Sequence, residues 1–231
     1  MLKLPTLPKH PTDKAGDVQH WHPLQGAGLA LATAELAKQS EYPVVLITES
    51  TASAYRLEQE IRFFIGELPV NLLPDWEILP YDPFSPHQDI VSDRLQALVN
   101  LPSLAQGVVI VPITTLMHRL APKAFLQGQT LKLKKGDVLD IEALRGQLSA
   151  AGYKHVDTVY EHGEFTMRGA IFDIYPMGSK FPYRIDLFDD EIETLRNFDP
   201  ETQRSDKRFD HINLLPAHEY PLDKAGINTF K

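Results

Sequence analysis

The chain has 231 residues, enough for one large domain or two smaller ones. Its 43% hydrophobic and 23% charged content excludes wholesale disorder, and its lack of cysteine excludes disulfides, thiolate zinc sites and cysteine nucleophiles. Its net charge of -8 argues against non-specific binding of nucleic acid, which usually relies on an excess of basic residues.

We expect the N-terminal segment to contain neither a signal peptide nor a membrane helix. Prolines at positions 5, 8 and 11 interrupt it, and the chain has no apolar stretch approaching the roughly 18 residues that a membrane helix needs. We therefore expect a cytoplasmic protein with no membrane partner and with residues 1–20 poorly ordered. Since the end at Lys231 carries no closing signal, we also expect a piece of a longer protein.

Residues 21–123 alternate between helix-like and strand-like patterns. Residues 29–38 are strong helix formers, and Ser50 or Thr51 can cap a second helix with an apolar stripe. The stripe consists of Ala54, Leu57, Ile61, Phe64 and Ile65. The apolar runs 43–47 and 107–111 are typical of strands buried on both faces. This order of elements predicts an α/β fold with a parallel sheet.

The pattern changes after Pro122. Residues 130–134 alternate as a strand, and residues 141–150 form a short helical pattern. From 153 to 216 the chain consists of short strand-like runs separated by turn residues at 161–164, 176–180 and 189–190. We place a domain boundary near residues 125–129 and a second one near 216–221.

The first candidate site is a phosphate-binding loop. Such a loop needs close glycines, then a lysine for the β- and γ-phosphates and a Ser or Thr for magnesium. Residues 24–33 contain Gly26 and Gly28, but the lysine position is apolar. We prefer a glycine turn that leads into a packed helix. A working nucleotide hydrolase is the competing interpretation, and a DNA-binding module is a third.

Other polar clusters have structural interpretations that we prefer to catalytic ones. His162 lies near Glu161 and Glu164, where a polar hairpin turn competes with a metal site. The hydroxyl cluster at 50–53 lacks the flanking glycines of a hydrolase nucleophile and is typical of a helix cap. The carboxylates at 186–193 fit a solvated turn as well as acid–base chemistry. We expect no catalytic residues, no metal and no cofactor in this chain.

The strand-like run 183–188 is the best candidate for a binding surface. Alternation places Arg184, Asp186 and Phe188 on one face and the apolar residues between them on the other. An exposed aromatic residue beside an arginine is typical of a protein-binding hot spot. Alternatively, Phe188 tucks into the turn at 189–190; the spacing alone leaves both interpretations open.

Four stretches of sequence together resemble one protein family. They are YKHVD at 153–157, EHGEFTMRGAIFDIYP at 161–176, YRIDLFDDEIE at 183–193 and DWEILPYDPFSPHQDI at 75–90. They are similar to the UvrB-like module near the N-terminus of bacterial transcription-repair coupling factors. The likeness extends over nearly the whole chain from Trp21.

The resemblance implies a fold and a domain order. Residues 21–123 would form a RecA-like, P-loop NTPase-like subdomain with a degenerate phosphate loop. Residues 124–216 would form an inserted, strand-rich mixed α/β domain that binds UvrA, and 217–231 would begin a second RecA-like subdomain. The stretch between Trp76 and Asp89 is too short for the β-hairpin with which UvrB clamps DNA.

The resemblance also implies a larger parent protein and a set of contact residues. The parent would be an ATP-driven DNA translocase that removes stalled RNA polymerase and recruits UvrA. ATP, magnesium, DNA and RNA polymerase would bind its other domains. Arg168, Arg184 and Phe188 match the family's UvrA contacts. Alternation agrees for Arg184 and Phe188 but predicts Arg168 on the face of Phe172 and Ile174, so its assignment rests on resemblance alone.

Overall fold

The computed structural model describes residues 16, 18, 20–21, 23–79 and 82–221, and its contacts divide the chain into two compact units. The first unit extends to Asp75 and includes Asn100–His118; the second contains Trp76–Val99 and the chain from Arg119 onward. Most of the segment 1–20, expected to be poorly ordered, lies outside the described residues. So do positions 222–231 of the expected third unit.

The first unit contains a three-stranded parallel sheet in the order β1-β3-β2. Its elements are α1 (Gly28–Gln39), β1 (Val44–Thr48), α2 (Thr51–Ile65), β2 (Val70–Leu72), η1 (Leu101–Ser103), β3 (Val108–Pro112) and α4 (Ile113–Leu116). Parallel strands flanked by helices confirm the α/β class that the alternating pattern predicts for this region.

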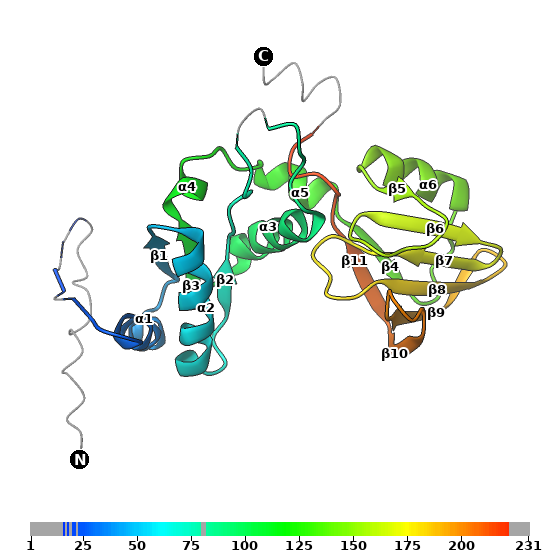
Figure 1. Cartoon of the computed structure of the whole chain (residues 1–231). Helices are drawn as coiled ribbons and strands as arrows, with labels where there is room; N and C mark the ends of the chain where they lie inside the picture. Colours follow the sequence, from blue (N-terminus) through cyan, green and yellow to red (C-terminus); the bar gives the residue numbers. More distant parts are fainter. Residues whose placement is uncertain (1–15, 17, 19, 22, 80–81, 222–231) are drawn as a thin grey trace. The chain divides into compact units, whose positions relative to one another are not determined.

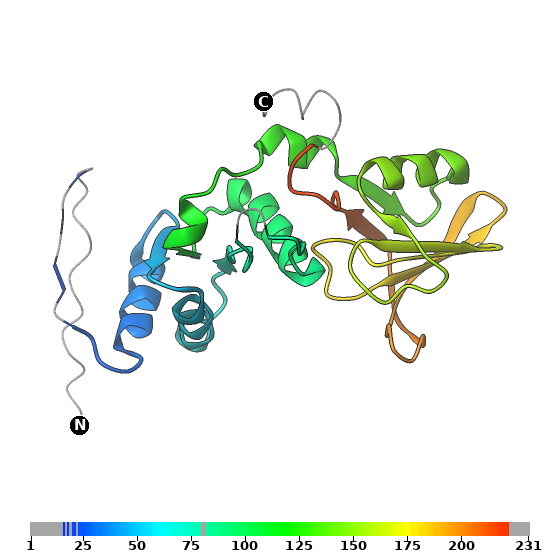
Figure 2. The ribbon, with the colours of Figure 1, turned by 45° about the horizontal axis from the view of Figure 1, so that its top comes forward.

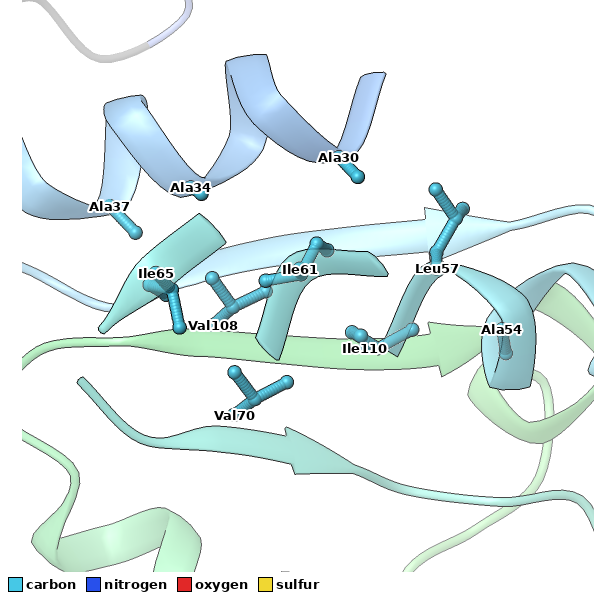
Figure 3. Packing of buried hydrophobic residues seen from close by; sticks show 10 residues of the cluster. All are labelled: Ala30, Ala34, Ala37, Ala54, Leu57, Ile61, Ile65, Val70, Val108 and Ile110. Atoms are coloured by element: carbon cyan, nitrogen blue, oxygen red, sulfur yellow. The ribbon is translucent and has the colours of Figure 1, made fainter. Parts of the chain in front are cut away.

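Helices α1 and α2 build the core of the first unit with the sheet. Ala30, Ala34 and Ala37 of α1 are fully buried and point toward the sheet, as Figure 3 shows. The predicted stripe of α2 is confirmed, with Ile61 fully buried against this cluster. The predicted cap is confirmed as well, because the Ser50 hydroxyl oxygen accepts a hydrogen bond from the Ser53 amide at 3.2 Å.

Strands β1 and β3 differ in burial although their sequences look alike. All five residues of β3 are buried, as predicted. In β1, however, Val45 and Ile47 are 58% and 51% exposed, so burial on both faces was a wrong prediction there. The reason is its place in the sheet: β1 is an edge strand and β3 is central, which the apolar run does not distinguish.

Gly107 is required where β2 meets β3. It precedes β3 with a φ of +127°, a conformation that side chains disfavour. A Cβ atom there would lie 2.3 Å from the Pro69 carbonyl oxygen, which accepts the Val108 amide at 2.9 Å. A larger residue would therefore disturb the start of the parallel pairing.

The second unit is rich in strands. A six-stranded sheet runs in the order β10-β9-β8-β7-β6-β5, antiparallel except for β5 and β6, and a separate pair joins β11 and β4 (Figures 1 and 2). Its helices are α3 (Gln88–Asn100, whose last residue groups with the first unit), α5 (Lys123–Gly128) and α6 (Ile141–Ala150). Its strands are β4 (Leu131–Lys134), β5 (Lys154–His155), β6 (Glu164–Arg168), β7 (Ile171–Ile174), β8 (Tyr183–Phe188), β9 (Glu191–Phe198), β10 (Ser205–Phe209) and β11 (His211–Leu214).

One face of the six-stranded sheet forms the core of this unit. Phe172, Ile185 and Leu195 lie directly opposite one another on β7, β8 and β9 and are almost fully buried. Phe165 of β6, which pairs with Ile174, is buried on the same face. Alternation then directs the residues between them to the opposite face.

Helix α3 is fixed to the second unit by a buried ion pair. The Arg94 guanidinium donates to the Glu219 carboxylate at 2.8 and 3.0 Å, and both side chains are fully buried. Arg94 also lies over the Trp76 ring, 4.2 Å from its centre. The segment 21–123, expected as one subdomain, thus contributes α3 to the second unit. Among the described helices, none is long and apolar enough to cross a membrane.

Candidate protein-binding site

The outer face of the six-stranded sheet carries charged side chains in register. We use "outer face" for the side that presents Arg168, Asp173, Arg184, Asp186 and Phe188. Asp173 of β7 lies directly opposite Arg184 of β8, which lies opposite Arg196 of β9. Residues directly opposite in antiparallel strands point to the same side. The row therefore places a negative side chain on β7 next to a positive one on β8.

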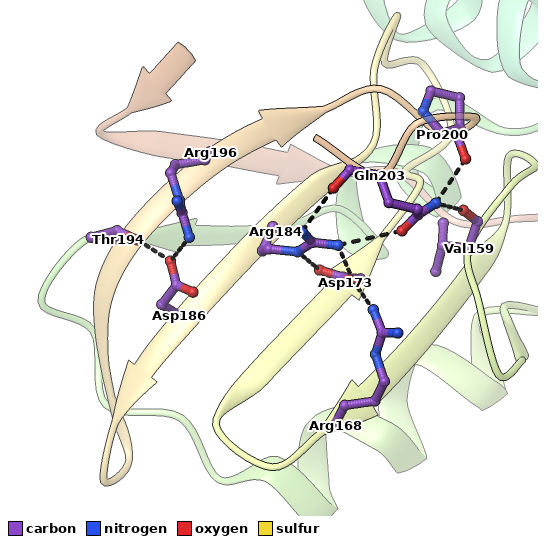
Figure 4. Close-up of polar contacts among 9 residues, drawn as sticks. All are labelled: Val159, Arg168, Asp173, Arg184, Asp186, Thr194, Arg196, Pro200 and Gln203. Atoms are coloured by element: carbon purple, nitrogen blue, oxygen red, sulfur yellow. Dashed lines mark hydrogen bonds and ion pairs between the residues drawn. The ribbon is translucent and has the colours of Figure 1, made fainter. Parts of the chain in front are cut away.

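Asp173 holds two arginines together. Its carboxylate is fully buried and accepts from Arg184 Nε at 2.8 Å, from Arg184 Nη2 at 2.9 Å and from Arg168 Nη2 at 2.8 Å (Figure 4). The contact with Arg184 is bidentate, the strongest arrangement for such a pair. A buried carboxylate needs such partners, because an unpaired charge inside a protein is costly.

Arg184 is almost saturated with hydrogen bonds. Besides Asp173, it donates to the Gln203 backbone oxygen at 3.1 Å and to Gln203 Oε1 at 3.4 Å. Its guanidinium lies 4.7 Å from the centre of the Phe198 ring, and 15% of the side chain is exposed. Hydrogen bonding to Asp173 raises the pKa of Arg184, so the group stays charged. Four of its five N–H donors are in use.

Arg168 lies on the outer face, contrary to the prediction from alternation. It pairs with Ile171 across the β6–β7 hairpin and reaches Asp173 beside Arg184. The prediction assumed uninterrupted alternation past residue 168, but β6 ends there and the turn at Gly169, with φ +60°, resets the parity. Half of the Arg168 side chain is exposed, in contrast to Arg184.

Phe188 projects into solvent at the end of β8. The residue is 72% exposed, whereas the neighbouring Leu187 is buried in the core. The turn that follows has Asp189 at φ +52°, a conformation typical of tight hairpins. The alternative in which Phe188 tucks into this turn is therefore wrong.

Three further polar residues, which were not predicted from the sequence as part of the site, complete the outer face. Arg196 Nη2 donates to the Asp186 carboxylate at 2.7 Å, and the Thr194 hydroxyl donates to the same carboxylate. Gln203 also bonds the backbone oxygens of Val159 and Pro200 at 3.2 and 2.7 Å, which ties Arg184 to two loops. An aspartate within the apolar run of β7 was the available signal for a buried charge pair.

The other candidate sites predicted from the sequence, the glycine loop and His162, are not part of the outer face. In the first unit, Gly26 has φ +55° and Gly28 begins α1, followed by Leu29, Ala30 and Leu31 where a phosphate loop carries its lysine. His162 contacts the Asp89 carboxylate at 2.7 Å and the Ser179 backbone oxygen at 2.8 Å. Across the described part of the chain, no three histidine, aspartate or glutamate side chains gather as a metal site would require.

Sequence comparisons identify the strand-rich region. Residues 131–220 match the family described as UvrB interaction domain. The chain is 52% identical over 218 residues to the transcription-repair-coupling factor of Escherichia coli K12, which covers 94% of the chain. The Haemophilus influenzae protein of that name is 48% identical over 98% of the chain, and the Staphylococcus aureus USA300 protein is 32% identical over 86%.

Nearly the whole chain is thus similar to one part of the transcription-repair-coupling factors, and residues 131–220 match the UvrB interaction domain. The chain spans about a fifth of the length of these relatives, 19% of each of the first two. The outer face lies wholly within the region that matches the UvrB interaction domain, since residues 168–203 fall inside 131–220.

Proposed function

We propose that this chain is a recruitment module that binds the excision-repair protein UvrA through the outer face. The observation that carries the proposal is the exposed Phe188 on the same sheet face as two arginines held by one buried carboxylate. Large aromatic residues and arginines on a rigid surface are typical of binding hot spots. The match of this region to UvrB interaction domains supports the same partner.

The geometry supports different contributions from the three matching residues. Arg168, half exposed and bonded to Asp173 through one nitrogen, is free to reach an acidic group of UvrA. Phe188 supplies the apolar anchor. Arg184, with one N–H donor left over, acts mainly as a positioning residue that holds Asp173 and its neighbours in place.

The proposal extends to the rest of the chain and to its parent protein. We assign a RecA-like subdomain to 21–123, the UvrA-binding domain to 124–216 and the start of a second RecA-like subdomain to 217–231. The chain itself would bind no cofactor and catalyse no reaction. The parent would be a cytoplasmic ATP-dependent DNA translocase that displaces stalled RNA polymerase, with DNA and polymerase bound by its other domains.

Titration calorimetry with purified UvrA tests the proposal. We expect Phe188→Ala and Arg168→Glu each to weaken binding by about 2 kcal/mol or more, because both remove a hot-spot contact. Phe181→Ala is the matched control: Phe181 is 49% exposed and precedes β8, at the opposite end of that strand from Phe188. Unchanged affinity for both site variants would contradict the assigned surface.

A further inference from the structure

Val138 is an exposed apolar residue that lies beside the outer face. The residue is 73% exposed, which matches the 72% exposure of Phe188. It lies in the loop between β4 and α6, about fifty positions from Phe188 in the sequence. Neither alternation within one strand nor the resemblance that supplied Arg168, Arg184 and Phe188 points to it.

The backbone places Val138 in the same row as Phe188. Phe188 of β8 lies directly opposite Glu191 of β9, and Glu191 lies directly opposite Val138 in an isolated antiparallel bridge. Directly opposite residues point to the same side, with Cβ atoms about 5 Å apart. The three side chains therefore form a continuous row of Phe188, Glu191 and Val138 at the edge of the outer face.

The loop that carries Val138 is held rigidly. The Leu139 amide donates to the Asp190 oxygen at 2.7 Å, and the Ile192 amide donates to the Asp137 oxygen at 2.9 Å. These two bonds flank the Val138–Glu191 pair, the arrangement in which opposite side chains approach most closely. The Asp137 carboxylate also accepts the Lys134 amide at 2.8 Å, which braces the loop internally. Binding would thus order little additional backbone here.

We propose that Val138 is a second apolar anchor for the partner that binds Phe188. This inference rests on the proposed function and specifies the chemistry of the partner surface. That surface would present an apolar side chain that contacts both Phe188 and Val138. It would carry basic groups next to this contact, facing the carboxylates of Asp189, Asp190 and Glu191, and an acidic group farther along, facing Arg168.

Two substitutions of Val138 test this in the full chain, with calorimetric titration of UvrA as the measurement. Val138→Ala removes two methyl groups from the contact and is expected to weaken binding about tenfold. Val138→Thr keeps the shape but brings a hydroxyl into the apolar contact, so it should weaken binding as well. Since Val138 is mostly exposed in the free chain, both variants should melt like the unaltered protein.

The pairing with Phe188 gives an independent measurement. If one partner side chain contacts both residues, the losses for Val138→Ala and Phe188→Ala should be non-additive in the double variant. Additive losses would overturn the shared contact. Normal affinity of both Val138 variants, with weakened binding by Phe188→Ala, would overturn this inference and leave the proposed function standing. No binding by the unaltered chain, or no effect of Phe188→Ala, would overturn the proposed surface itself.

Discussion

The two sheets of this chain use their faces differently. In the first unit, α1 and α2 cover one face of a small parallel sheet, and the packed contacts are apolar, as at Ile61. In the second unit, one face of the larger sheet is an apolar core, while the outer face pairs the buried Asp173 with two arginines. Apolar packing sets the stability of the first sheet. On the second sheet, charge pairing with Asp173 also fixes the positions of the Arg168 and Arg184 side chains.

Among substitutions that distinguish the two sheets, Ile61→Ala should cause the largest loss of stability. Ile61 is fully buried in the core of the first unit, so its truncation leaves a cavity and should cost roughly 2–5 kcal/mol. Denaturant unfolding measures this loss. The protein that remains folded should bind UvrA normally, because the outer face belongs to the second unit; a matching loss of affinity would show that the two sheets are not independent.

A smaller change in stability, with a clear effect on binding, is expected for Asp173→Asn. The amide keeps the shape but removes the charge that holds Arg168 and Arg184, which should cost about 2 kcal/mol of stability. UvrA affinity should fall too, although the buried Asp173 cannot touch a partner itself.

The matched control for Asp173→Asn is Glu193→Gln, which removes an exposed carboxylate from β9. It should change neither unfolding nor UvrA titration appreciably. If Asp173→Asn lowered stability but left the affinity for UvrA intact, charge pairing on the outer face would be structural only, and the contrast between the two sheets would fail.

The smallest effect is expected at the start of α2. Ser50→Ala removes the side-chain acceptor of the Ser53 amide and should cost about 1 kcal/mol in denaturant unfolding, without a change in UvrA affinity. Ser50→Asp supplies another capping oxygen and should restore most of the loss. Failure of this rescue would mean that Ser50 stabilises the first unit by something other than its cap.

Apolar periodicity predicted the local elements well, because it reports which side of a helix or strand is buried. The stripe of α2, the cap at Ser50 and the faces of β8 follow from neighbours in the sequence. Periodicity does not report the position of a strand within a sheet, so the exposure of Val45 was missed. It also fails across a turn, where the parity of Arg168 changes.

The parts of the site that were not predicted depend on contacts between distant positions. Asp173 meets Arg184 only through strand pairing, and Gln203 reaches Arg184 from a loop after β9. Val138 joins the row through one isolated bridge with Glu191, which leaves no periodic pattern in the sequence. The resemblance to a family supplied Arg168, where reasoning from alternation pointed to the wrong face.

The buried pair of Arg94 and Glu219 bears on how the second unit can be cut from the chain. Arg94 precedes and Glu219 follows the segment Asn100–His118, which belongs to the first unit. The second unit is therefore discontinuous in sequence. A truncated protein limited to residues 131–220 would keep Glu219 but lose α3 and with it Arg94, and removing one member of a buried ion pair is strongly destabilising. The smallest autonomously folding piece should therefore begin before Trp76, whose ring stacks on Arg94.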